Sequence, residues 1–343
     1  MNRFSLTYLG LFLLLLSVLS FFNIIYSYYF NLYLNIDAYI YTLITSLFLG
    51  FTFLIKKKAD GKISIYIKIL TLITGYLILP LIISIPYYLS IYNISYLNCF
   101  FEAVSGFTST GFTIFENIKH IDESLILWRS SSQWIGGIYF LFSIILLIDI
   151  FDDNLKKSLT NYISFNSAEI FKQSLKILLL YSILTLFLFI VLKLINIRTF
   201  DSFNLSMTII SSGGFLPFNN IDLIINSDLK KIVFSILMLF SYFSLFLTYN
   251  FFYLRKKSLN FFAEDIYLFI YLIFLIIVFF VFFNFDYNFS LILFSITSSI
   301  SNIGISLNNT PNNLFFLFLI LVIIGGSFFS TSSGIRFLKL YLL

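Results

Sequence analysis

The chain alternates long apolar runs with short polar segments. Eight long runs lie at 5–25, 38–55, 63–85, 126–148, 175–195, 232–254, 266–283 and 314–324. Most of these runs are close to the roughly 20 residues that a helix needs to cross the hydrocarbon core of a bilayer. The pattern therefore predicts an all-α polytopic membrane protein with about eight transmembrane helices.

Three shorter apolar stretches lie between the long runs, at 91–104, 200–210 and 289–300. Each is too short to cross a bilayer and is followed by a turn that ends in glycine, at Gly111, Gly214 and Gly304, about 90 to 100 residues apart. Irregular backbone at membrane depth is tolerated only where protein buries it or where it lines a water-filled cavity. We therefore expect three re-entrant pore half-helices, each between two long helices.

This repeat divides the chain into four segments. We predict an N-terminal helix pair at 1–58, a first membrane-pore-membrane unit at 59–150, a second unit at 165–257 and a third unit at 262–343. The second helix of the third unit is predicted to be broken, because Gly325, Gly326 and Gly334 bracket a run of Ser and Thr there. Each glycine inside a helix costs about 1 kcal/mol relative to alanine.

The charged residues indicate an orientation. They make up only 11% of the chain, against about 25% in ordinary soluble domains. Basic residues gather after every second long run, at 56–58 and 62, at 156–157, at 255–257, and at Arg336 and Lys339. The positive-inside rule then places these boundaries and the N-terminus in the cytoplasm. The net charge of +5 follows from this topology, so we predict no nucleic-acid partner.

A glycine-containing turn at the end of a half-helix has a specific electrostatic use. The C-terminal end of a helix carries a partial negative charge that stabilises a nearby cation. A turn can aim backbone carbonyls inward to replace the hydration shell of an ion, and glycine adopts the backbone angles that such a turn requires. The alternative is a tight loop that only packs helices together, since Ser, Thr and Gly are also common at helix interfaces in membranes.

Two charged residues, Glu102 and Arg129, lie inside apolar stretches, where a charge requires a partner or access to water. Glu102 lies on the first half-helix, where a buried acid should have a partner. Arg129 lies near the start of the fourth long run, and it either extends to the lipid headgroups or braces the half-helix. The sequence contains no nucleotide-binding glycine loop, no nucleophile paired with a base and no cluster of metal ligands. We therefore predict no enzyme activity and no cofactor.

Several motifs resemble the TrkH/KtrB family of potassium transport proteins. They are FEAVSGFTSTGFT from Phe101, LWRSSSQWIGG from Leu127, SSGGF from Ser211 and GGSFFSTSSGIRFLKLYLL from Gly325. The resemblance covers nearly the whole sequence. It implies a fold of membrane-pore-membrane units, transport of potassium with sodium as a second candidate ion, and a multi-pass location in the bacterial inner membrane.

Carried over position by position, the resemblance assigns residues to a filter and to a gate. The implied selectivity filter, where K⁺ would bind as the transported ion, consists of Thr108, Ser109, Thr110, Gly111, Ser211, Ser212, Gly213, Gly214, Ser301, Asn302, Ile303 and Gly304. The implied intramembrane gating loop contains Gly325, Gly326, Ser327, Ser330, Thr331, Gly334 and Arg336.

The sequence departs from the family pattern in two places. Phe328 and Phe329 stand where the family's gating stretch generally has small residues, which predicts either a bulkier constriction or a shifted loop. The fourth unit of the family has no counterpart here, so we expect either a separately encoded fourth unit or a non-conducting, truncated remnant. A polytopic membrane enzyme or flippase is the alternative from another functional class. By analogy with the family, a homodimer and a cytosolic nucleotide-binding regulatory subunit are the expected partners, besides the lipid bilayer.

Overall fold

The structure is a computed structural model that describes residues 3–55, 64–147, 170–245, 263–282, 288–308, 315–337 and 339. The chain divides into two compact units. Unit 1 comprises Met1–Phe151 and Pro217–Asn219, and unit 2 comprises Asp152–Leu216 and Asn220–Leu343.

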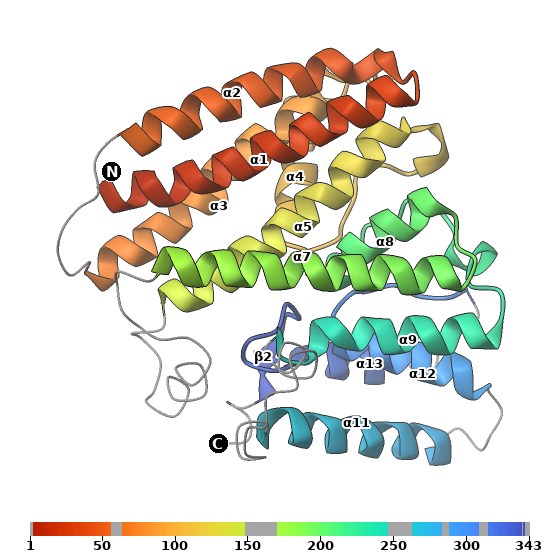
Figure 1. The fold of residues 1–343 in the computed structure, drawn as a ribbon. Coiled ribbons are helices and arrows are strands. Elements are labelled where there is room, and N and C mark those ends of the chain that lie inside the picture. The colour runs from red at the N-terminus through yellow and green to blue at the C-terminus, as the bar shows by residue number, and fades with distance from the viewer. Residues whose placement is uncertain are drawn as a thin grey trace. The chain divides into compact units, whose positions relative to one another are not determined.

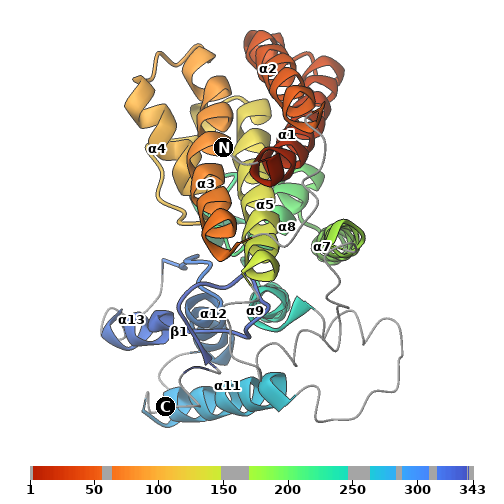
Figure 2. The same ribbon diagram turned by 90° about the vertical axis from the view of Figure 1, so that its left-hand side faces the viewer.

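Unit 1 contains the N-terminal helix pair and the first predicted repeat. Its helices are α1 (Arg3–Tyr29), α2 (Ile36–Ile55), α3 (Ile65–Leu89), α4 (Tyr96–Phe107) and α5 (Glu123–Leu146), with short 3-10 helices at Tyr33–Asn35 and Ile118–His120. Helix α1 packs along α2, and both contact α3 (Figure 1). The short helix α4 packs against α3 and α5, the two long helices on either side of it in the sequence (Figure 2). The side chain of Asn219 joins this unit by accepting a bond from the N–H of Ile118 at 2.7 Å.

Unit 2 contains the described elements of the second and third repeats. Its helices are α7 (Ile170–Leu194), α8 (Thr199–Ser211), α9 (Asp228–Tyr242), α11 (Ala263–Phe282), α12 (Phe289–Ile300) and α13 (Phe315–Ile323), with a 3-10 helix at Ile221–Leu223. Two short parallel strands, β1 (Ile324–Gly325) and β2 (Ile335–Arg336), pair with Ile324 opposite Ile335. Helix α8 contacts α7 and α9, and α12 contacts α9, α11 and α13. Each short helix therefore packs against the long helices of its own repeat.

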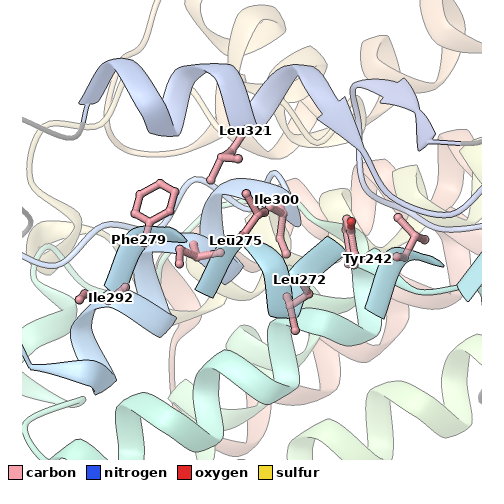
Figure 3. Packing of buried hydrophobic residues seen from close by; sticks show 9 residues of the cluster. Tyr242, Leu272, Leu275, Phe279, Ile292, Ile300 and Leu321 are labelled. Atoms are coloured by element: carbon pink, nitrogen blue, oxygen red, sulfur yellow. The ribbon is translucent and has the colours of Figure 1, made fainter. Parts of the chain in front are cut away.

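A buried apolar cluster holds the third short helix in place. Figure 3 shows Leu272, Leu275 and Phe279 of α11 facing Ile292 and Ile300 of α12 and Leu321 of α13. The cluster is completed by Tyr242, Leu268 and Ile296. Because Ile300 is the last residue of α12 and is fully buried, the cluster fixes the end of the helix from which the third turn emerges.

Within the described residues, five helices are long and apolar enough to cross a membrane: α1, α2, α3, α7 and α11. The other three long runs are also helical in the described residues. Helix α5 has 24 residues but a polar middle, α9 is described over 15 residues, and α13 has 9 residues before the chain leaves helical geometry at β1. Helix α9 ends at Tyr242, before the predicted end of the sixth run, because Phe243 adopts an extended backbone. Residues 246–254 of that run lie outside the described residues. The third run is longer than predicted, because Pro86 lies inside α3, which continues to Leu89.

Candidate functional site

The three glycine-ended turns have the same backbone conformation. We call them turn 1 (108–111), turn 2 (211–214) and turn 3 (301–304). The closing glycines have positive φ values of 83°, 79° and 74° at Gly111, Gly214 and Gly304. Two residues earlier, the φ values are also positive, at 55° for Ser109, 56° for Ser212 and 58° for Asn302. Such values are uncommon for residues other than glycine, so their recurrence in three places identifies one repeated structural element.

A shared pattern of backbone bonds explains the left-handed residues. In turn 1 the N–H of Thr110 bonds to the carbonyl of Ser105 at 2.9 Å, and the N–H of Ser109 bonds to the carbonyl of Gly106 at 3.0 Å. This pair of bonds, with a left-handed residue just after the helix, is the Schellman motif that ends many helices. The same pair occurs in turn 2 between Gly213 and Thr208 and between Ser212 and Ile209, and in turn 3 between Ile303 and Ser298 and between Asn302 and Ser299.

A buried ion pair supports turn 1 within unit 1. Glu102 of α4 and Arg129 of α5 are 0% and 1% exposed, and Nε of Arg129 donates to the Glu102 carboxylate at 2.9 Å. The carboxylate also accepts from the hydroxyl of Thr113 at 3.0 Å and from the N–H of Ile114 at 2.9 Å. Arg129 Nη2 donates to the Thr113 hydroxyl at 2.9 Å. Arg129 therefore braces the half-helix and the chain that follows turn 1, which decides between the two roles that the sequence left open.

Turns 2 and 3 contact each other in unit 2. The hydroxyl of Ser212 donates to the carbonyl of Ser301. Residues of the predicted gating loop contact the same region: the Thr331 hydroxyl donates to the carbonyl of Ile210 at 2.7 Å, and Asn302 Nδ2 donates to the carbonyl of Ser333 at 3.2 Å. The structure thus brings the loop to the backbone directly before turn 2 and to a side chain of turn 3.

The loop itself is a nine-residue excursion (326–334) between the two strands. Gly325 and Gly326 permit close backbone approaches, since an added Cβ would lie 2.3 Å from the carbonyl oxygen of Ser333 and 2.2 Å from that of Tyr242, respectively. Gly334 has a φ of 87°. The break that the glycines predicted is therefore present in the chain after α13.

Arg336 organises the loop from inside. Its guanidinium donates to the carbonyls of Ser327, Ser330 and Ser332 and to the hydroxyl of Ser330, at 2.8 to 3.3 Å. Five donors in a fixed planar arrangement suit such multiple contacts. Phe328 and Phe329 are buried, 4% and 2% exposed, so these bulky residues pack within the protein.

Glu264, at the start of α11, is a site residue that the sequence analysis missed. Its carboxylate accepts from the N–H of Phe328 at 2.7 Å and from the hydroxyl of Ser327 at 3.3 Å. The neighbouring Asp265 accepts from the N–H of Ser244 at 3.0 Å. In the sequence both acids resemble ordinary charges at a membrane boundary. Their contacts arise only in the folded chain, where the break after α13 brings the loop close to the start of α11.

The Glu264 contacts predict a measurable role in holding the loop. We expect Glu264→Ala to destabilise the protein by about 1–3 kcal/mol, because the N–H of Phe328 and the hydroxyl of Ser327 lose their carboxyl acceptor in a partly buried position. Amide hydrogen exchange across 326–333 should become faster, while Glu264→Gln, which keeps an acceptor oxygen, should have a smaller effect. Exchange at wild-type rates in Glu264→Ala would contradict this role.

The candidate ion ligands are the backbone carbonyls and hydroxyls of the three turns. Across the ranges that the structure describes, no group of three His, Cys, Asp or Glu residues could together hold a metal ion. Turn 1 belongs to unit 1, and turns 2 and 3 belong to unit 2.

Comparison with solved structures gives a match over the whole chain. The crystal structure of the potassium transporter TrkH from Vibrio parahaemolyticus matches 100% of this chain and 74% of that chain, with a TM-score of 0.84 and 20% sequence identity. The chain has the TrkH fold. The resemblance to the TrkH fold is thereby confirmed, and the chain is a multi-pass membrane protein whose described secondary structure is all-α apart from the two short strands.

Comparison with curated proteins gives distant relatives. The uncharacterized cation transporter MJ1485 of Methanocaldococcus jannaschii is 26% identical over 330 residues, which are 90% of this chain and 65% of that protein. The Trk system potassium uptake protein TrkI of Halomonas elongata is 39% identical over 66 residues, 19% of this chain and 12% of that protein. The chain thus spans less than two thirds of the length of the curated relatives it matches. No protein-family model matches the chain.

Proposed function

We propose that the chain is the pore-forming part of a TrkH-type transporter that conducts potassium, with sodium as a second candidate ion, down its electrochemical gradient. Selectivity comes from the backbone of turns 1, 2 and 3, and the loop 326–334 acts as the gate. The observation that carries the proposal is the same paired left-handed backbone in all three turns. Rings of backbone carbonyls in repeated turns are the means by which potassium filters replace the hydration shell of the ion.

The proposal of potassium draws on the relatives as well as on the geometry. The matched structure is named as a potassium transporter, and the matched curated proteins are named as a cation transporter and a potassium uptake protein. The contacts of Thr331 and Asn302 support a gate at the loop, because they join it to the carbonyl of Ile210, directly before turn 2, and to the Asn302 side chain of turn 3.

Orientation and assembly are further parts of the proposal. We place the N-terminus in the cytoplasm and the chain in the bacterial inner membrane; most of the basic residues behind this orientation, at 56–58, 62, 156–157 and 255–257, lie outside the described residues. A homodimer and a cytosolic nucleotide-binding regulatory subunit are the partners we propose.

Potassium-limited growth tests the function. A bacterium stripped of its own potassium importers should grow at low potassium and take up rubidium when it expresses this chain, alone or with a fourth membrane-pore-membrane unit. If the membrane-inserted protein supports no growth and no uptake, either alone or with a fourth unit, the result would favour the non-conducting remnant or a membrane enzyme or flippase.

A variant at Gly304 of turn 3 tests the effect of the backbone angle without a steric clash. A Cβ at Gly304 would meet nothing within 4 Å, yet φ there is +74°, a region that costs other residues about 1–2 kcal/mol. We expect Gly304→Ala, and likewise Gly111→Ser, to lower the preference for potassium over sodium in rubidium competition. Unchanged preference in either variant would contradict the filter.

A further inference from the structure

Three buried hydroxyl groups on the short helices bond forward along the chain. Ser and Thr side chains within helices commonly donate to the carbonyl three or four residues earlier, as Ser295 of α12 does with Leu291 at 2.9 Å. Ser105, Thr208 and Ser298 instead donate to the carbonyl seven residues later, at 2.5, 2.8 and 2.6 Å. The three acceptors are the residues directly after the turn glycines, namely Phe112, Phe215 and Ile305.

The same three residues also hold the chain before each glycine. The carbonyl of Ser105 accepts from the N–H of Thr110 at 2.9 Å. The equivalent bonds join Gly213 to Thr208 at 2.9 Å and Ile303 to Ser298 at 3.2 Å. One residue of each short helix therefore fixes its turn on both sides of the glycine, with its main chain before and its side chain after.

We propose that Ser105, Thr208 and Ser298 are positioning residues for ion selection. The inference rests on the proposed function and adds to it the side chains that set the shape of the turns. Their hydroxyls turn the carbonyl after each glycine back toward the short helix, which removes it from any ion path. The peptide groups between the bonded N–H before each glycine and the bonded carbonyl after it then have little freedom to move closer around sodium, the smaller ion.

Burial makes these bonds hard to replace. Ser105, Thr208 and Ser298 are 4%, 0% and 3% exposed. In turns 2 and 3 the acceptor residues Phe215 and Ile305 are buried as well, whereas Phe112 in turn 1 is exposed. A variant without the hydroxyl in turn 2 or turn 3 therefore leaves a buried carbonyl short of its donor, which is more costly than losing an exposed bond. Serine serves in turns 1 and 3 and threonine in turn 2, which indicates that the hydroxyl is the required group.

Helix α12 supplies a matched set of variants. Ser298→Ala removes the forward bond, Ser298→Thr keeps the hydroxyl, and Ser295→Ala removes a buried hydroxyl that bonds only backward. We expect Ser298→Ala to speed amide exchange across 302–306 about tenfold, since local opening sets exchange rates and about 1.4 kcal/mol corresponds to tenfold. Its preference for potassium over sodium should fall by a similar factor, while Ser298→Thr and Ser295→Ala keep wild-type exchange and preference. Thr208→Val and Thr208→Ser should behave in the same way in turn 2.

The readouts separate the possible failures. Unchanged exchange in Ser298→Ala, or faster exchange with unchanged ion preference in an active protein, would overturn the positioning role and leave the proposed function intact. An equal loss of preference in Ser295→Ala would also overturn it, because any buried hydroxyl would then suffice. A wild-type chain that transports no rubidium, even with a fourth unit, would overturn the proposed function and this inference with it.

Discussion

Replacing Arg129 by methionine is expected to destabilise unit 1 by about 3–5 kcal/mol, because the substitution leaves the Glu102 carboxylate buried without its cation. Glu102 lies 2.9 Å from Arg129 and is 0% exposed, and it also accepts bonds from Thr113 and Ile114 just after turn 1. The loss of the cation therefore affects both the stability of the unit and the backbone of the turn. Thermal unfolding of the detergent-solubilised protein measures the first effect, and the potassium preference of rubidium uptake measures the second.

A double variant serves as the control. Glu102→Gln combined with Arg129→Met removes both charges, and replacing both members of a buried ion pair is much less costly than removing one. The double variant should recover part of the lost stability. Two results would contradict this role of the ion pair. One is an Arg129→Met variant that is as stable as the wild type, and the other is a double variant that is no more stable than Arg129→Met.

The second large effect is expected for Gly136→Ala. The added Cβ would lie 1.9 Å from the carbonyl oxygen and 2.7 Å from the carbonyl carbon of Phe107, the last residue of α4. Because the opposing atoms are backbone, α4 must move away from α5, and turn 1 must move with it. Overpacking of this kind costs about 1–3 kcal/mol or more, and rubidium uptake should lose its ion preference.

Gly50→Ala is the matched control for this variant. Its Cβ would meet the end of the Leu14 side chain at 2.9 Å, which can rotate, and alanine favours the helix by about 1 kcal/mol. We expect near wild-type stability and uptake. If Gly136→Ala has the same unfolding temperature and the same rubidium uptake as Gly50→Ala, the close approach of α4 to α5 is contradicted.

Much of the framework was predictable because it depends on local composition. The short apolar stretches at 200–210 and 289–300 match α8 and α12 within a residue or two. The first stretch was placed too early: α4 starts at Tyr96 rather than at residue 91, because the chain first turns through Asn93, whose φ is 50°, and Ser95 precedes the first helical residue. Apolar runs indicate that an element exists, while turn geometry decides where it begins.

The sequence indicated that Glu102 needs a partner and offered bracing of the half-helix as one of two roles for Arg129, but it did not pair the two residues. They are 27 residues apart, and no spacing rule pairs residues on two helices joined by an irregular segment. Glu264 was overlooked because an acid at the start of an apolar helix is common. The serine or threonine six residues before each turn glycine was visible in all three repeats, but hydroxyl residues are too frequent in this chain for that recurrence alone to single them out.

Ion selection by the three turns is tested by rubidium influx into liposomes that contain only the purified protein, with the fourth unit added if growth requires it. We expect influx that potassium inhibits far more strongly than sodium in the wild type. That difference should shrink in Gly304→Ala, where only the backbone angle is disturbed. Influx no greater than in empty liposomes, or an identical potassium preference in Gly304→Ala, would contradict an ion path selected by the backbone of these turns.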